Sequence, residues 1–384
     1  MERGAGVTAD VIFITGTQRS GTTLLEKLLG SQEGISILSQ PFPLLFIEAK
    51  RAFLRSRGLA DPYPMGHLFL EQRYSSNAFH SFLDNWRAAP AEIEAMFTRM
   101  RDYSGQYTKF TEEQLARAFA AINPEDDFAN VVAKLEHLLA SSLNARWYGS
   151  KETICEEYIP TLLDRGFRCA IIIRDPRDVV ASLNHGRGQE FGGAVKPTLF
   201  NVRNWRKSVA FALAMEGHPR FHWCRYEDLV ADPTSELDRL VHAIDLEDVS
   251  RVLIAEEIVE KGGAVWPGNS SFQAHNGVST SSVARYRDVL PDSVVGMIEA
   301  TCFPELRVLG YETSIDEDQA TRIIESFHDP YAITRREMEN DLATQENCAI
   351  EVRRLQELAL PANDPVSWFL FDRVATRLRE SFHS

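Results

Sequence analysis

Hydrophobic positions along the chain alternate between short apolar runs and longer stretches with helical spacing. The apolar runs at 11–14, 35–38 and 169–173, together with 148–152 and 221–225, predict strands. Between them, apolar residues recur every three or four positions, as on the buried stripe of a helix. Strands that alternate with helices predict an α/β fold with a doubly wound, mainly parallel sheet.

The alternation of strands and helices is interrupted by one helical segment, and it does not extend to the C-terminal region. Helical spacing without intervening strands predicts a helical insertion at about 60–147. After residue 312 the chain becomes acidic and helical, with no chemistry that its pattern suggests. We therefore expect a main domain over 1–312 and a C-terminal helical extension over 313–384.

Three local patterns carry further expectations. Residues 199–217 have the spacing of an amphipathic helix, and a turn is expected after the strand at 221–225. Residues 261–282 are rich in Gly, Ser and Asn and have no periodicity. A loop of that length is usually functional or disordered.

The most informative stretch follows the first strand. A turn bounded by Gly16 and Gly21 leads into a helix that starts near Thr22 and Thr23, an arrangement whose backbone N–H groups form an anion site. The glycine spacing matches a nucleotide phosphate loop, but the Lys that follows in P-loop NTPases is absent. Arg19 stands inside the loop instead. The loop is therefore expected to hold a phosphate, but not a Mg-ATP triphosphate.

A second anion anchor follows the strand at 169–173. Arg174 comes directly after that strand, and Ser182 lies eight positions later on the next predicted helix. An Arg fork with a hydroxyl suits a separate phosphate monoester. Because ligands in such sheets lie at the carboxyl ends of strands, both anchors should meet at one edge.

Charge and cysteine usage narrow the function classes. The net charge of −14 argues against general binding to nucleic acids or anionic membranes. No apolar run reaches the roughly 20 residues that span a bilayer, and no signal layout is present, so no stable membrane insertion is expected. The five cysteines are scattered without a C-x-x-C pair, which favours a reducing cytoplasm. No metal-ligand cluster is evident.

Three segments together resemble a known family. TQRSGTTLL, IIIRDPRDVVAS and WCRYEDLVADP occur in this order, and NSSF and GVSTSSVARYRDVL follow. They resemble the PAPS-dependent sulfotransferases over roughly residues 10–311, where PAPS is 3′-phosphoadenosine 5′-phosphosulfate. The resemblance implies a P-loop-like sulfotransferase fold and transfer of a sulfonate group from PAPS to a hydroxyl, with release of PAP and without a metal.

The resemblance also implies a nucleotide site. The residues that match the 5′-phosphosulfate loop are Arg19, Ser20, Gly21, Thr22 and Thr23, and those that match the 3′-phosphate pair are Arg174 and Ser182. Tyr226 is similar to a tyrosine that contacts the nucleotide. Ser279 falls where some members have a serine near the sulfonate and nucleotide.

The expected catalytic residues are Arg19, Lys151 and Ser279. Lys151 is placed like a lysine that steadies charge on the transferring oxygens. Sulfuryl transfer develops charge on the sulfonate and leaving oxygens, so it needs positioning and cations more than covalent chemistry.

The general base is the point of departure from the family. Related enzymes commonly have Glu where this chain has Gln40, and a neutral amide cannot accept a proton. Three alternatives follow. Gln40 only orients the acceptor hydroxyl, or the acceptor ionises easily and needs little help, or another residue is the base. The candidates for that base are His275, Glu152, His67 and His185. Gln40 and His275 are the expected substrate residues.

The expected acceptor is a small molecule, lipid or secondary metabolite, with no nucleic-acid partner, and a homo-oligomer stays open. Two other functions also stay open: a P-loop kinase with an altered loop, and a nucleotide-binding protein whose catalysis has lapsed. Trp147, Trp205, Trp266 and the Phe-rich run 42–53 are expected in the core rather than in an acceptor pocket.

Overall fold

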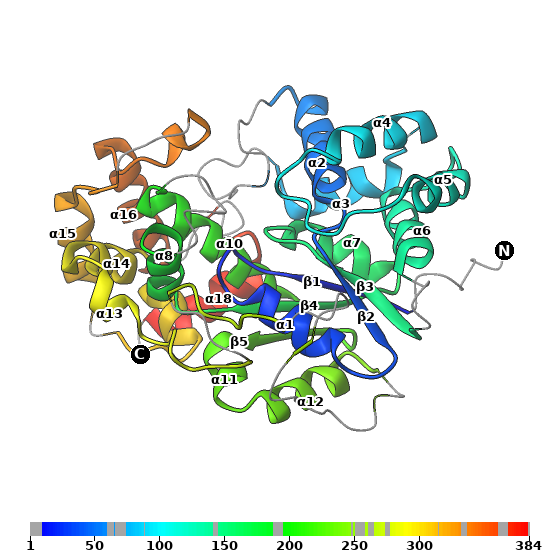
Figure 1. Ribbon diagram of the computed structural model, residues 1–384. Coiled ribbons are helices and arrows are strands. Elements are labelled where there is room, and N and C mark those ends of the chain that lie inside the picture. Colours follow the sequence, from blue (N-terminus) through cyan, green and yellow to red (C-terminus); the bar gives the residue numbers. More distant parts are fainter. Residues whose placement is uncertain are drawn as a thin grey trace.

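The protein is built on a five-stranded parallel sheet, seen in a computed structural model (Figure 1). The structure describes residues 10–59, 65, 74–87, 89–140, 145–186, 195–246, 249, 258–259, 265–272, 277–313, 315–331, 336–359 and 368–382. The strands are β1 (Val11–Thr15), β2 (Ile35–Ser39), β3 (Trp147–Lys151), β4 (Arg168–Ile173) and β5 (Phe221–Arg225), in the order β2-β3-β1-β4-β5. The predicted α/β sheet is confirmed.

The strand order puts a topological switch point at β1. It pairs with β3 on one side and with β4 on the other, with Ile14 opposite Lys151 and Thr15 opposite Ile171. The chain therefore leaves β1 between the carboxyl ends of β3 and β4, where doubly wound sheets bind their ligands.

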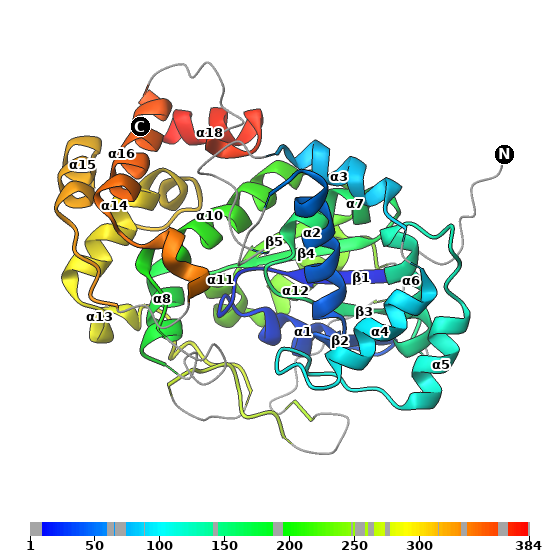
Figure 2. The same cartoon turned by 90° about the horizontal axis from the view of Figure 1, so that it is seen from above.

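Helices cover both faces of the sheet (Figures 1 and 2). Ile12 and Ile14 pack in one apolar core with α1 (Thr22–Gly30) and α12 (Pro233–Ala243). Val11 and Phe13 belong to the core of the opposite face, which α2 (Pro43–Ser56), α6 (Phe128–Ala140) and α10 (Thr198–Met215) share. Successive residues of β1 thus feed opposite cores, as the two-residue period of a strand requires.

The helical insertion lies over α2 and consists of α3 (Ser76–Asn85), α4 (Pro90–Met100), α5 (Glu112–Ala120) and α6. Thr111 caps α5 through a capping box with Gln114. The segment before that cap returns to the end of β2, where Thr108 N–H donates to the Ser39 carbonyl at 2.9 Å. The insertion therefore borders the edge of the sheet where the ligand site is expected.

The remaining helices follow β3 and β4 or lie after β5. They are η2 (Glu156–Tyr158), α7 (Ile159–Asp164), α8 (Pro176–Asn184), α11 (Tyr226–Ala231), α13 (Tyr286–Val289), α14 (Asp292–Val308), α15 (Glu317–Ser326), η3 (Arg336–Asp341), α16 (Gln345–Ala359) and α18 (Asp372–Phe382).

Two sequence expectations were wrong. The turn expected after β5 is the short helix α11. The helix α10 is not amphipathic, because every residue from Thr198 to Ala214 is buried. It lies between the sheet and the C-terminal helices, and two of its buried cations form internal ion pairs, Arg203 with Glu351 and Lys207 with Glu156.

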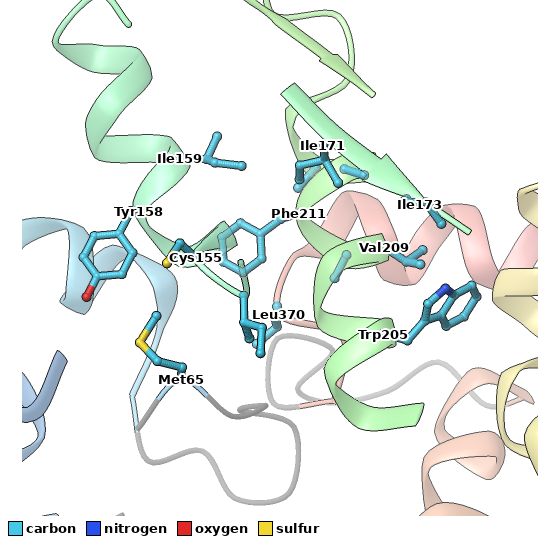
Figure 3. Close-up of a cluster of buried hydrophobic side chains, with 14 of the residues drawn as sticks. Met65, Cys155, Tyr158, Ile159, Ile171, Ile173, Trp205, Val209, Phe211 and Leu370 are labelled. Atoms are coloured by element: carbon cyan, nitrogen blue, oxygen red, sulfur yellow. The ribbon is translucent and has the colours of Figure 1, made fainter. Parts of the chain in front are cut away.

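The C-terminal helices pack against the main body. Contacts join α18 to α10 and α14, and α16 to α14 and α15. Leu370 lies in one apolar cluster with Phe211 of α10 and Ile171 of β4 (Figure 3). The boundary at residue 312 stays a prediction, but the helices beyond it share the core of the sheet.

A buried charge cluster fastens the same region. Glu351 of α16 accepts from Arg203 Nε at 2.7 Å and lies 2.7 Å from Arg206 Nη1. All three side chains are essentially inaccessible to solvent. Burial alone would raise the pKa of Glu351, but the two guanidinium groups lower it strongly, so this carboxylate stays ionised.

Candidate active site

A cavity of about 1100 Å³ lies at the carboxyl ends of the strands. It is lined by the loop after β1, the ends of β2 and β3, and residues 266–271. Its basic side chains outnumber its acidic ones among the described residues. The basic ones are Arg19, Lys27, Arg51, Lys151, Arg174 and Lys196, and the acidic ones are Glu26 and Glu152. A protein with a net charge of −14 thus has a cavity suited to an anion.

The glycine-bounded loop connects β1 directly to α1. Gly21 is the N-cap of α1 at φ 104°, and no side chain caps the helix. A Cβ at Gly21 would lie 2.5 Å from the Tyr226 ring, and one at Gly16 would lie 2.6 Å from the Ile172 carbonyl oxygen. Only glycine allows these close approaches. The N-terminus of α1 is therefore open toward the cavity, and Thr22 and Thr23 are among the lining residues.

Arg19 occupies the left-handed region at φ 64°, which is unusual for a side chain of this size. Its Nε donates to Ser182 Oγ at 3.1 Å, and its guanidinium also donates to the Ser271 hydroxyl. The two hydroxyls are themselves 2.7 Å apart. The structure therefore brings Arg19 and Ser182 together, whereas Ser20 is buried and bonds back to the Thr17 carbonyl.

Arg174 is held from three sides. Its guanidinium donates to the Arg19 carbonyl at 3.2 Å and to the Ser282 carbonyl at 2.5 Å, and it lies 4.5 Å from the centre of the Tyr226 ring. Burial raises the pKa of Tyr226, so its phenol stays neutral beside this cation. Arg174 Nε is buried without a partner in the described part of the chain. Thr17 Oγ1, in the loop, is also buried without a hydrogen-bond partner among the described residues. Buried donors of this kind fit an anionic ligand.

Ser279 does not line the cavity among the described residues. It holds Asn269 instead: Ser279 N–H donates to Asn269 Oδ1 at 3.0 Å, and Asn269 Nδ2 donates to the Ser279 carbonyl at 2.9 Å. Asn269 Nδ2 also donates to the Tyr226 hydroxyl at 2.6 Å. Asn269 and Ser271 are lining residues that the sequence analysis did not assign, and Trp266, which was expected in the core, also lines the cavity. The aperiodic Gly/Ser/Asn-rich segment at 261–282 was the signal that pointed to them.

Lys151 ends β3 and is 1% exposed. Its Nζ donates to Gln40 Oε1 at 3.3 Å and lies 3.6 Å from Glu26 Oε2 and 5.5 Å from the centre of the Tyr107 ring. Burial lowers the pKa of Lys151, and the carboxylates of Glu26 and Glu152 act in the opposite direction. The structure thus holds a partly desolvated amine in the cavity wall.

Gln40 has both ends of its amide engaged. Its oxygen accepts from Lys151, and its Nε2 donates to the Gly105 carbonyl at 3.0 Å. Its backbone, at φ 40°, donates to the Lys151 carbonyl at 2.8 Å. These contacts make Gln40 the junction between Lys151 and the helical insertion.

The structure describes two of the four candidate bases, Glu152 and His185. Glu152 lines the cavity, and its Oε1 accepts from Phe42 N–H at 2.6 Å where α2 begins. Burial raises the pKa of Glu152 to about 8. His185 bonds through Nε2 to the Tyr331 hydroxyl at 2.9 Å and is not among the described lining residues. His67 and His275 lie outside the described residues, so the substrate assignment of His275 stays a prediction.

The described part of the chain has no helix that is long and apolar enough to cross a membrane. Within the same residues, no group of three or more His, Cys, Asp or Glu side chains is arranged to hold a metal ion.

A parallel sheet, a glycine-bounded loop at its switch point and basic side chains around one cavity define an α/β protein with a cavity suited to an anionic ligand. A family model described as the sulfotransferase family matches residues 10–250, which is more than half of the chain. The chain therefore belongs to the sulfotransferase family.

Several solved structures are similar to this chain. The sulfotransferase domain from the curacin biosynthetic pathway is 20% identical, with 78% of this chain and 97% of that chain covered and a TM-score of 0.39. The sulfotransferase domain of the Synechococcus PCC 7002 olefin synthase is 16% identical, with 75% and 93% covered and a TM-score of 0.39. Retinol dehydratase in complex with androsterone and inactive cofactor PAP is 14% identical, with 80% and 84% covered and a TM-score of 0.36. No curated protein matched the chain.

Proposed function

We propose that this protein transfers a sulfonate group from PAPS to a hydroxyl of a small-molecule or lipid acceptor and releases PAP. The observation that carries the proposal is the presence of Arg19, Arg174 and Lys151 in the wall of one basic cavity, with the buried Ser182 hydroxyl bonded to Arg19. The proposed compartment is the cytoplasm, and the five free, buried cysteines support a reducing environment.

Two anion anchors support PAPS as the donor. The backbone N–H groups at the start of α1, with Arg19, Thr22 and Thr23, would hold the 5′-phosphosulfate. Arg174 and Ser182 would hold the 3′-phosphate, which ATP lacks. Because both anchors are already cross-linked in the protein, little reorganisation would accompany binding.

Replacing Arg174 by alanine is expected to weaken PAP binding by roughly 10- to 150-fold, the value of a hydrogen bond to a charged group. The affinity for AMP, which has no 3′-phosphate, should change far less. Isothermal titration calorimetry with both nucleotides measures the difference. Arg99→Ala, which removes an exposed arginine on α4, is the control. Equal losses for PAP and AMP would contradict the 3′-phosphate assignment.

The proposed reaction is a displacement at sulfur. The acceptor oxygen forms a bond to sulfur as the bond between sulfur and the 5′-phosphate oxygen breaks, and the electron pair of that bond leaves with PAP. Lys151 and Arg19 would compensate the charge that develops on the sulfonate and leaving oxygens. The hydroxyl proton would pass to the Glu152 carboxylate, which shares the cavity with Lys151.

Glu152 leads to a prediction about pH. Since its pKa is about 8, the carboxyl is mostly protonated at lower pH and cannot accept a proton. With an alcohol acceptor, kcat/KM should therefore rise by about tenfold per pH unit below pH 8 and then level off. Glu152→Gln should remove this slope.

Glu136 provides the matched control for that pH profile. It is a second buried carboxyl whose pKa burial raises to about 8, and it does not line the described cavity. Glu136→Gln should keep the slope of the wild type. If Glu152→Gln also keeps it, Glu152 is not the base.

The cavity wall also suggests the class of acceptor. The lining is of mixed polarity and includes apolar side chains, among them Pro43, Ile47, Ile154 and Leu183. Tyr103 and Tyr107 also line the cavity, and Tyr107 is 49% exposed although it is a large aromatic side chain. These side chains support an acceptor with an apolar part, whose hydroxyl would be directed at Lys151 and Glu152.

The direct test is transfer of radiolabelled sulfonate from PAPS to a panel of phenols, aliphatic alcohols and sterols. The proposal expects a labelled sulfate ester of at least one apolar hydroxyl compound, without added Mg²⁺. Tight PAP binding with no transfer to any panel member would favour a nucleotide-binding protein without catalysis. Transfer of the γ-phosphoryl group from Mg-ATP instead would favour a kinase.

A further inference from the structure

The C-terminal region contributes a side chain to the cavity. Met338, in η3, lines it together with Met65, Ile154 and Leu183. Met338 is 3% exposed, and among the described residues it is not part of either apolar core cluster. It is therefore a buried apolar side chain of the cavity wall.

The helix that carries Met338 is fastened to α10. Arg203, fully buried in α10, donates to Asp341 Oδ1 at 2.8 Å and to the Asn340 carbonyl at 3.3 Å. These are the two residues at the end of η3. Arg203 also donates to Glu351 of α16. The guanidinium of one residue of α10 therefore contacts both η3 and α16.

The segment just before η3 is fastened to the same side of the cavity. Asp329 accepts from Thr198 N–H at 2.7 Å at the start of α10, and the Tyr331 hydroxyl bonds to His185 after α8. Leu183 and Lys196, which line the cavity, lie beside these two anchors. The attachment at both ends gives Met338 a defined position in the wall.

We propose that Met338 is a specificity-determining residue that limits the length of the apolar part of the acceptor. This inference rests on the proposed sulfotransferase function and assigns the C-terminal region a role in acceptor choice. The acceptor class is a hydroxyl compound with an extended apolar tail, whose far end packs against Met338, Met65 and Leu183. A methionine suits such a position because its unbranched thioether adapts to different apolar shapes.

A series of 4-alkylphenols tests the proposal, because the tail grows while the reactivity of the hydroxyl stays nearly constant. The measurement is kcat/KM for 4-methyl- to 4-octylphenol with Met338→Ala, Met338→Leu and Met338→Trp. The Trp variant should lose at least about tenfold for the longest tails, and the Ala variant should gain for them relative to short ones. The Leu variant should resemble the wild type. PAP affinity should stay within about twofold in all three, since a methionine thioether donates no hydrogen bond to a phosphate.

Met96→Ala is the matched control, because Met96 is 5% exposed on α4 and does not line the described cavity. It should keep the tail-length profile of the wild type. If all three Met338 variants also keep that profile, the inference is overturned. A wild type that binds PAP but neither sulfonates nor binds any alkylphenol overturns it too, whereas the nucleotide function stands. A wild type that does not bind PAP refutes the proposed function itself.

Discussion

The Lys151→Met variant is expected to transfer sulfonate about 100- to 1000-fold more slowly than the wild type, which is the usual cost of losing one preorganised donor to developing charge. Lys151 is positioned in advance by Gln40 and Glu26, so its ammonium would not reorganise during transfer. Because that charge develops mainly in the transition state, PAP affinity should stay within about threefold. Steady-state kinetics and calorimetry with PAP give the two quantities.

A variant of a second buried lysine tests whether the role of Lys151 is catalytic or structural. Lys50 is also 1% exposed and forms an ion pair with Glu157, but it does not line the described cavity. Lys50→Met should lower stability as much as Lys151→Met does, with turnover close to that of the wild type. If both variants lose turnover equally, Lys151 acts only through the fold.

Replacing Glu351 by glutamine is expected to lower the free energy of unfolding by about 3–5 kcal/mol, because it removes the carboxylate charge that the buried guanidinium groups of Arg203 and Arg206 share. Arg203 and Arg206 are both buried in α10 and meet Glu351 at 2.7 Å. Since α10 packs against the sheet as well as the C-terminal helices, the whole protein should be destabilised in one transition. Urea unfolding followed by circular dichroism measures the change.

The same helix provides the control for this variant. Glu357 of α16 is paired with the exposed Arg353 at 3.8 Å. Such surface pairs contribute at most about 1 kcal/mol, so Glu357→Gln should have little effect. A Glu351→Gln variant as stable as the Glu357→Gln variant would contradict the view that the C-terminal helices are fastened by buried charge.

The sheet was predictable because its signals are local. The run from Val11 to Ile14 and the turn from Gly16 to Gly21 lie within a dozen positions, and the run that became β4 is followed directly by Arg174. Buried strands, tight turns and helix starts of this kind are encoded over short windows. The expected strands and their parallel pairing were therefore confirmed.

The parts that sequence did not reveal depend on distant residues. Arg203 and Glu351 are separated by 148 positions, so the spacing around α10 suggested an exposed polar stripe where the structure has a buried charge cluster. Met338 reaches the cavity from a segment whose sequence suggested no chemistry. All three tryptophans expected in the core are core residues, and Trp266 also lines the cavity.

The most direct test of the account is a thermal shift assay with PAP, ATP and AMP, each with and without Mg²⁺. A ligand that binds only the native state stabilises it by about 2.7 kcal/mol at a hundredfold excess over Kd. Arg19, Arg174 and Ser182 predict a large shift with PAP that does not depend on Mg²⁺, and smaller shifts with the other two nucleotides. A shift with Mg-ATP and none with PAP would contradict the account and favour a kinase.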